Sequence, residues 1–302
     1  MKGLTFSRTE LSQSTENDIM DVYTDGIKSV YNKNEWSKTL ELCAEFHSYS
    51  PKNCVLIKQQ MPNAIAVAGK SVWKKRGRVV NENEKPISIL APKTDENGRI
   101  VPNSFITVKV YDISQTQGKE YTPQETEING KEHPKEILSA LKKIIYPASL
   151  AISSSPMDMQ SYFDEKNNTI VLKKGMSNDE ILYSIINETI KKSIATIGND
   201  SKTQQLQSES ISFVACKSLS IATPEMTADV ASWANDKSVE ELEDNFNFII
   251  SSSKNLVSEI SKDILPERKE VKQNSAYDRF KKHKTSENIP KRPTSRYQFD
   301  RN

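Results

Sequence analysis

Apolar residues recur at helical spacing through most of this 302-residue chain. In residues 16–32 they fall three or four positions apart, which predicts an amphipathic helix. The same pattern predicts a short helix at 71–77 and longer helices at 34–47, 51–61, 135–146, 178–197, 203–220, 224–235 and 238–264. Pro51 suits the first turn of its helix, and Asn178-Asp179 is expected to cap the helix that Gly198 ends.

Strands are predicted in both halves of the chain. Residues 87–91 form a short apolar run, and residues 105–111 alternate between apolar and polar as a half-buried strand does. Residues 161–163 and 169–172 flank Asn167-Asn168, a pair that favours the turn of a β-hairpin.

This order of elements predicts an α+β fold with two domains. The expected division is a flexible leader (1–15), an N-terminal α+β domain (16–120), a linker (121–134), a mostly helical domain with the hairpin (135–265) and a basic disordered tail (266–302). The tail carries about 11 basic and about 5 acidic residues. Such a tail either aids solubility as a solvated segment or contacts phosphates.

Composition narrows the class of protein. The formal net charge is +2 and 35% of the residues are hydrophobic. No apolar run approaches the roughly 20 residues of a membrane span, and the first residues lack the apolar core of a secretory signal. The three cysteines are too few and scattered for a disulfide framework, so a cytoplasmic protein with free thiols is expected. The three histidines are not spaced as metal ligands, and no cofactor is expected.

Residues 187–191, Asn-Glu-Thr-Ile-Lys, match the frame of a zinc-protease helix without its histidines. In the working motif, H-E-x-x-H, two histidines one turn apart hold the metal and the glutamate activates water. Here Asn187 and Lys191 stand at the histidine positions, and only Glu188 is kept. Asn is a poor zinc ligand, and a protonated Lys has no lone pair to donate. The sequence therefore predicts no zinc-dependent enzyme activity.

The first half of the chain resembles the single-stranded-DNA-binding domain of ArdC-type antirestriction proteins, which plasmids, phages and integrative elements carry. The resemblance covers residues 20–120. It rests on the runs FHSYS (46–50), QMPNA (60–64), VAG (67–69) with Trp73, EKPI (84–87), ILAP (89–92) and VYDISQTQG (110–118). It implies that the protein binds single-stranded DNA.

The second half resembles the metallopeptidase-like domain that follows in the Firmicutes versions of this family. The matching runs are GMS (175–177), ESISFVAC (209–216) and DVASW (229–233). The resemblance implies that Glu209 stands at the third zinc-ligand position, so that 188, 191 and 209 come together. We expect the Lys191 ammonium to pair there with Glu188 or Glu209 and to replace part of the missing ion's charge. The alternative is that Lys191 is a plain surface residue.

Non-specific binding of single strands needs cations for phosphates and aromatic faces for bases. The run 72–78 supplies both, and the helix before it adds further candidates. The predicted DNA-binding residues are Tyr49, Lys52, Asn53, Lys58, Trp73, Lys74, Lys75, Arg76 and Arg78. The alternative for Tyr49 and Trp73 is a place in the hydrophobic core.

Two functions remain open at this point. In the first, the protein is a non-catalytic single-stranded-DNA-binding protein of a mobile element that protects or escorts DNA. In the second, the degenerate peptidase domain is an interaction module that binds a host defence or replication protein. The sequence does not separate these two functions.

Overall fold

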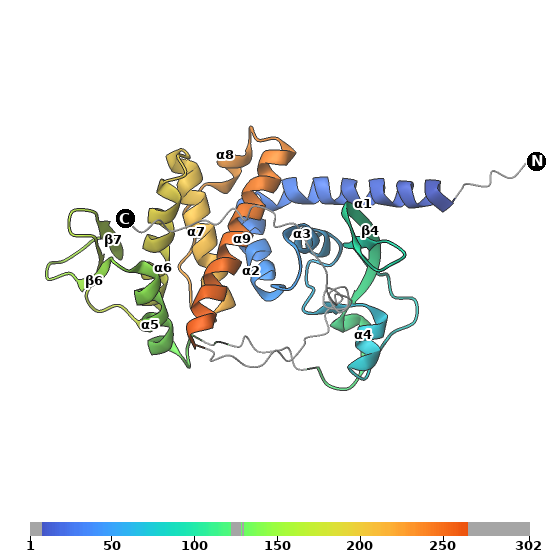
Figure 1. The fold of residues 1–302 in the computed structure, drawn as a ribbon, viewed down its shortest axis with the longest axis horizontal. Helices are drawn as coiled ribbons and strands as arrows, with labels where there is room; N and C mark the ends of the chain where they lie inside the picture. Colours follow the sequence, from blue (N-terminus) through green and yellow to red (C-terminus); the bar gives the residue numbers. More distant parts are fainter. Residues whose placement is uncertain (1–7, 122–127, 129, 265–302) are drawn as a thin grey trace, which may run out of the picture. The chain divides into compact units, whose positions relative to one another are not determined.

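The structure, a computed structural model, describes residues 8–121, 128 and 130–264, and Figure 1 shows how the elements are arranged. Helices and three small sheets make up an α+β fold, so the predicted fold class is confirmed. The chain divides into two compact units. Of the described residues, 8–91, 106–121, 128 and 130–264 belong to one unit, and 92–105 belong to the other.

Three helices open the chain: α1 (Arg8–Val30), α2 (Lys33–Glu45) and α3 (Pro51–Gln60). α1 begins at Arg8, eight residues before the predicted start at 16. Residues 1–7 of the predicted leader lie outside the described part. The Asn32 side chain caps α2 and the Ser50 side chain caps α3, which satisfies backbone N–H groups at both starts. Pro51 occupies the first turn of α3, as predicted.

Short strands and the helix α4 (Lys70–Lys75) follow. β1 (Val67–Ala68), β3 (Ile87–Thr94) and β4 (Ile100–Asp112) form a sheet in the order β1-β4-β3, and β2 (Arg78–Val80) pairs with β5 (Thr116–Gly118). The predicted strands at 87–91 and 105–111 are confirmed and are longer than expected. β1, β2 and β5 were not predicted, because two or three residues are too few to show a period.

The buried side chain of Asp112 organises this region. One carboxylate oxygen accepts hydrogen bonds from the backbone N–H groups of Ile65 and Ala66, at 2.8 and 2.9 Å. The other accepts from the N–H and hydroxyl of Ser114. Gln115 accepts from the Asp112 N–H and donates to the Lys85 carbonyl. The run at 110–118 therefore has a structural role, since its polar side chains tie β1, β4 and the 84–85 segment together.

The remaining elements are mostly helical. They are α5 (Pro134–Ile145), β6 (Ser149–Ile152), β7 (Ser161–Asp164), β8 (Thr169–Leu172), α6 (Asn178–Ala195), α7 (Ser201–Ser218), α8 (Val230–Ala234) and α9 (Val239–Ile264). The predicted hairpin is confirmed as the antiparallel pair β7–β8. β6, which was not predicted, runs parallel to β8 and completes the order β6-β8-β7. The helix predicted at 224–235 is reduced to α8.

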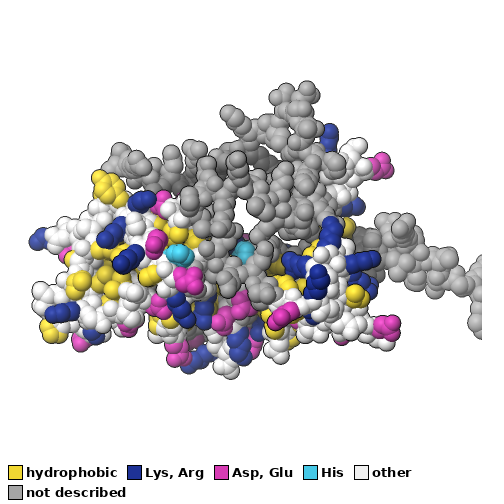
Figure 2. All heavy atoms as spheres, turned by 90° about the horizontal axis from the view of Figure 1, so that it is seen from below, with side chains coloured by type: hydrophobic (Ala, Val, Ile, Leu, Met, Phe, Trp, Pro, Cys, Tyr) yellow, Lys and Arg dark blue, Asp and Glu magenta, His cyan; other side chains and the backbone are white. Residues whose placement is uncertain are grey.

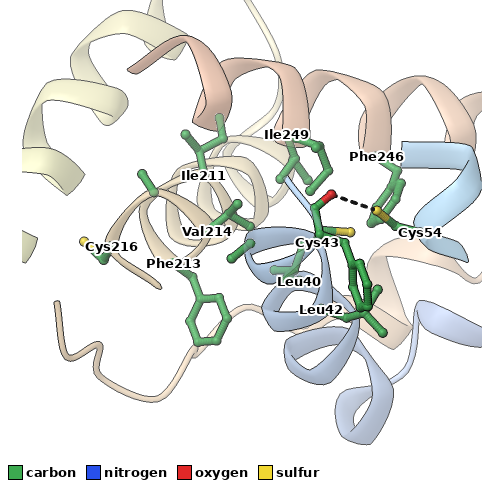
Figure 3. Close-up of a cluster of buried hydrophobic side chains, with 14 of the residues drawn as sticks. Leu40, Leu42, Cys43, Cys54, Ile211, Phe213, Val214, Cys216, Phe246 and Ile249 are labelled. Carbon is green, nitrogen blue, oxygen red and sulfur yellow. Dashed lines mark hydrogen bonds between the residues drawn. The ribbon is translucent and has the colours of Figure 1, made fainter. Parts of the chain in front are cut away.

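One hydrophobic core joins helices from both halves of the chain. Figure 3 shows Leu40 of α2, Val214 of α7 and Phe246 of α9 meeting in it. The Trp36 indole N–H donates to the Ser210 hydroxyl at 3.0 Å. The Tyr31 hydroxyl donates to the Leu242 carbonyl at 2.7 Å. Because α1 and α2 are packed on α9 and α7, the structure does not confirm the division into two domains.

The predicted linker is partly packed. Ile128 is buried, and the Gly130 N–H donates to the Leu219 carbonyl at 2.6 Å. Residues 122–127 and 129 of this linker, and the predicted tail at 266–302, lie outside the described residues. Their predicted character therefore stays a prediction.

The three cysteines are free and buried. Burial raises the pKa values of the Cys43 and Cys216 thiols, which keeps them protonated and unreactive. Within residues 8–121 and 128–264, no helix has the length and apolar character that crossing a bilayer requires.

Candidate functional site

The helix α6 carries the altered zinc-protease frame. Its N-terminus is fixed by Ser177, whose hydroxyl accepts from the Glu180 N–H while the Glu180 carboxylate accepts from the Ser177 N–H. This capping box corrects the predicted cap at Asn178-Asp179, which are the first two helical residues. Gly198, with φ of +83°, follows the end of the helix. The frame 187–191 therefore lies within a regular helix, on turns that face β7 and α7.

Lys191 pairs with Glu188. The Lys191 ammonium lies 3.0 Å from a Glu188 carboxylate oxygen, and the Ser161 hydroxyl of β7 donates to the same oxygen at 3.0 Å. The Glu188 side chain is 6% exposed and that of Lys191 is 49% exposed. A buried carboxylate is costly without partners. The two donors meet this need, and the carboxylate partner expected for Lys191 is thus Glu188.

Glu209 has different partners. Its carboxylate accepts from the backbone N–H groups of Thr227 and Ala228 at 2.7 and 2.9 Å, and from the Thr227 hydroxyl at 2.6 Å. The Gln205 amide also donates to it at 3.0 Å. Lys191 therefore pairs with Glu188, one of its two expected partners. Glu209 instead binds the backbone at 227–228, in the segment that follows α7.

A cavity of about 930 Å³ lies beside these side chains, within the first compact unit. Helices α6 and α7, strand β7 and the 224–227 segment line it, and the lining includes Asn187, Glu188, Lys191 and Glu209. The four side chains of the predicted degenerate centre are therefore brought together.

These side chains do not fit zinc. The Asn187 oxygen accepts from the Ser212 hydroxyl at 3.3 Å, and the Lys191 ammonium offers no lone pair. Neither position supplies the imidazole that a zinc site of this type requires. In the described part of the chain, no cluster of three or more His, Cys, Asp or Glu side chains is arranged to hold a metal ion.

Trp73 anchors α4 and is not available to a ligand. Its side chain is fully buried, and its indole N–H donates to the Tyr111 carbonyl at 2.8 Å. It belongs to a small core with Ala66, Ala68 and Tyr111. A base cannot stack on a buried ring, so the prediction that Trp73 contacts DNA is corrected in favour of the core alternative.

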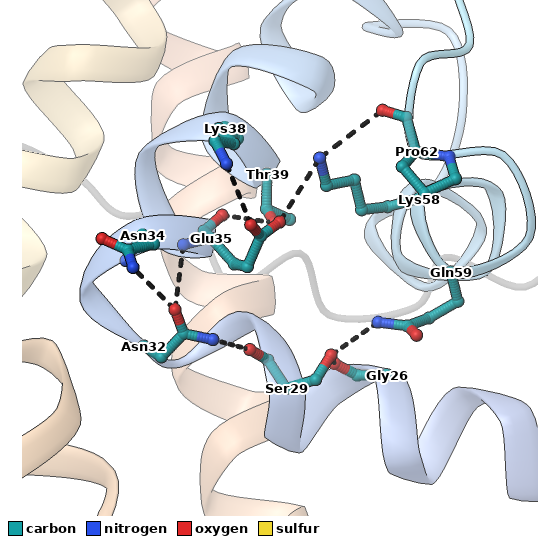
Figure 4. Close-up of polar contacts among 10 residues, drawn as sticks. All are labelled: Gly26, Ser29, Asn32, Asn34, Glu35, Lys38, Thr39, Lys58, Gln59 and Pro62. Carbon is teal, nitrogen blue, oxygen red and sulfur yellow. Dashed lines mark hydrogen bonds and ion pairs between the residues drawn. The ribbon is translucent and has the colours of Figure 1, made fainter.

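Four candidates on or beside α3 also have internal partners. The Tyr49 hydroxyl donates to the Val67 carbonyl at 2.8 Å, and buried Asn53 both donates to and accepts from the backbone of Leu90. Figure 4 shows buried Lys58 held between Glu35 and the Pro62 carbonyl. Lys52 forms an ion pair with Glu243 at 2.8 Å. The predicted DNA-binding roles of Asn53 and Lys58 are corrected, because both side chains are buried and cannot reach a DNA strand. Tyr49 and Lys52 are half-buried, and each already has a partner within the protein.

The cations of α4 and its C-terminus are exposed. Lys70, Lys74, Lys75 and Arg76 all reach solvent, and we call these four residues the α4 surface. Figure 2 shows dark-blue side chains gathered on the right, in the region where Figure 1 places α4. Arg78 is half-buried and donates to the Thr116 hydroxyl and carbonyl and to the Lys119 carbonyl. Lys70, which the predicted set lacks, lies one turn before Lys74 on the same short helix, and its ammonium is 5.1 Å from the centre of the Tyr111 ring.

Comparisons with known proteins give a local relative and similar solved structures. No protein-family model matches the chain. Over 93 residues, the chain is 36% identical to an uncharacterized Bacillus anthracis protein, pXO2-81. The matched segment is 30% of this chain and spans 15% of that protein's length. Two crystal structures of the antirestriction ArdC protein from plasmid R388 are also similar. The metal-free form has a TM-score of 0.46 at 14% identity, covering 71% of this chain and 85% of that chain. The Mn(II)-bound form has a TM-score of 0.45 at 16% identity, covering 73% and 90%.

Proposed function

We propose that this protein binds single-stranded DNA through the α4 surface. The observation that carries the proposal is the exposure of Lys74, Lys75 and Arg76 around one turn that buried Trp73 fixes to the fold. Cations on a fixed support attract phosphates without the ordering cost of a flexible segment. The resemblance of residues 20–120 to a single-stranded-DNA-binding domain points to the same ligand.

We propose in addition that the protein is not a zinc-dependent enzyme. Support comes from the bonding at the altered frame: the Lys191 ammonium occupies one side of Glu188, and four hydrogen bonds engage Glu209. The two carboxylates expected at the metal site, Glu188 and Glu209, are therefore bonded to other groups of the protein.

The proposed biological role is antirestriction-like. We propose that a plasmid, phage or integrative element supplies the protein in the cytoplasm of a bacterial host, where it protects or escorts entering DNA. The sequence resemblance supports this role, and the plasmid protein whose two crystal structures are described above is itself named an antirestriction protein.

The cavity beside α6 favours a second candidate function. A cavity of about 930 Å³ is within the size range of ligand pockets, and apolar side chains such as Phe163 and Ile194 line it next to polar ones. In this candidate function, the degenerate peptidase region binds a host defence or replication protein. Blocking the cavity with Ala195→Trp should then abolish that interaction and leave DNA binding intact.

Titration of the purified protein with labelled single-stranded and double-stranded DNA at two salt concentrations tests the first proposal. We expect tighter binding of the single strand and a fall in affinity with added salt. Absence of binding to either DNA would reject it. Metal analysis of the same sample tests the proposal that the protein is not a zinc enzyme, and stoichiometric zinc would reject that proposal.

A further inference from the structure

Arg76 is held in a fixed position by aromatic side chains. Its guanidinium carbon lies 5.4 Å from the centre of the Trp73 ring and 5.7 Å from that of Tyr121. The two rings are nearly perpendicular, at 78°, with centroids 5.5 Å apart. Cations within about 6 Å of an aromatic ring are attracted to it. The arginine therefore has a preferred position before any ligand arrives.

The backbone at Arg76 is fixed as well. Its N–H donates to the carbonyls of Val72 and Trp73 at 3.1 and 2.9 Å at the end of α4. The positive charge of Arg76 also affects the nearby hydroxyl of Tyr49. Burial raises the pKa of Tyr49 to about 12, while the nearby positive charge of Arg76 opposes this rise.

The donors of Arg76 remain free. Among the described residues, its guanidinium forms no hydrogen bond and no ion pair, although an aromatic pair holds it. Arg78, two residues further on, has the opposite arrangement, since its guanidinium donates to three backbone or hydroxyl oxygens of β5 and Lys119. Lys74 and Lys75 are exposed, but no aromatic ring holds either one. The Lys70 ammonium also lies over a ring, 5.1 Å from the centre of Tyr111, but a lysine has no planar fork of donors. Of the four residues of the α4 surface, Arg76 is thus the one that combines an aromatic-held position with unpaired guanidinium donors.

We propose that Arg76 is the phosphodiester-binding residue that positions the DNA strand on the α4 surface. The inference rests on the proposed function and assigns this residue a role distinct from that of the lysines. A guanidinium presents a planar fork that binds two phosphate oxygens at once, and a prearranged fork loses little freedom on binding. Lysines on flexible stems contribute charge without fixing a position.

The test compares charge-conserving variants. Arg76→Lys keeps the charge but removes the fork, and Lys75→Arg is the matched control. Each variant is titrated with two probes, a single-stranded oligonucleotide and an abasic strand of the same length. Arg76→Lys should bind both probes about tenfold more weakly, because one bidentate pair is replaced by a single contact. Lys75→Arg should bind as the unaltered protein does.

Three results would overturn the inference. Unchanged affinity of Arg76→Lys for both probes would show that only its charge matters, while the proposed function would stand. A loss confined to the oligonucleotide with bases would assign Arg76 to a base and not to phosphate. Failure of the unaltered protein to bind either probe would reject the proposed function and the inference together. Equal urea midpoints of the variants would exclude unfolding as the cause of weaker binding.

Discussion

The Lys191 ammonium and the Glu188 carboxylate form an ion pair of 3.0 Å on adjacent turns of α6. Glu188 is the one residue of the zinc-protease frame that the chain keeps, and Lys191 stands where the second histidine is expected. The pair neutralises a nearly buried carboxylate. The structure thus gives Lys191 a carboxylate partner, and its role as a substitute for the charge of a metal ion stays a prediction.

Removing the lysine charge should destabilise the fold. In Lys191→Met, Glu188 keeps only the Ser161 hydroxyl as a partner, and the free energy of unfolding should fall by about 1–2 kcal/mol, a value lowered by the half-exposure of Lys191. Adding Glu188→Gln should recover much of the loss, because the buried charge disappears too. Urea unfolding of the two single variants and the double variant measures the coupling. Additive effects would mean that the ion pair contributes nothing.

Introducing histidines at positions 187 and 191 should create a metal site. Asn187→His with Lys191→His places two imidazoles one turn apart on α6, with Glu209 across the cavity as a third ligand. We expect this double variant to retain zinc after gel filtration and the unaltered protein to retain none. Elemental analysis gives the answer. A double variant that folds and holds no zinc would contradict the frame assignment, and Asn187→Gln with Lys191→Arg is the control.

Substitution of Trp73 should reveal a structural role. Trp73→Ala removes a fully buried indole and should lower the free energy of unfolding by about 3–5 kcal/mol. Trp73→Phe loses the hydrogen bond to Tyr111 and a smaller part of the packing. Single-strand affinity of folded Trp73→Phe should be close to that of the unaltered protein. A large loss of affinity with unchanged stability would return Trp73 to the DNA-binding residues.

Acid should destabilise the protein through its helix caps. Hydrogen bonds from Ser177, Thr203 and Ser238 lower the pKa values of Glu180, Asp200 and Glu241 below their ordinary values. Carboxylates with lowered folded pKa values stabilise the fold above their unfolded pKa values of 4.5, 3.8 and 4.5. That stability is lost as the pH falls through the folded pKa values.

The variant Glu180→Gln, Asp200→Asn, Glu241→Gln tests this acid dependence, because its amide oxygens still accept the capping hydrogen bonds but do not titrate. Its unfolding free energy, measured by urea at pH values from neutral to acid, should fall less steeply than that of the unaltered protein. Identical pH profiles would contradict the account.

Periodicity predicted the long elements well. Helices such as α2, α3, α5 and α9 carry a continuous apolar stripe, and their predicted bounds differ from the observed ones by a few residues at most. β6 escaped prediction because its four residues are mainly exposed and make sense only beside β8. Packing between the two halves could not be predicted from periodicity, because contacts such as that of Trp36 with Ser210 join residues far apart in the chain.

Some predicted DNA-binding residues were wrong, because they were chosen by residue type alone. Lys58 and Asn53 look like surface residues in the sequence, yet Glu35 and the Leu90 backbone provide partners that only the folded chain brings near. Sequence gave no sign that Arg76 and Arg78 differ, because β5, which takes up the donors of Arg78, was not predicted. The roles of the exposed cations of the α4 surface stay predictions.

DNA binding at the α4 surface is tested by the single-strand affinity of the Lys74→Glu, Lys75→Glu, Arg76→Glu variant at low salt. The control is Lys166→Glu, Lys174→Glu, Lys202→Glu, which reverses three exposed lysines outside the α4 surface and changes the net charge equally. We expect the α4 variant to lose at least about tenfold in affinity and to show a flatter salt dependence, while the control keeps most of its binding. Equal losses in the two variants, or unchanged binding by the α4 variant, would contradict DNA binding at the α4 surface.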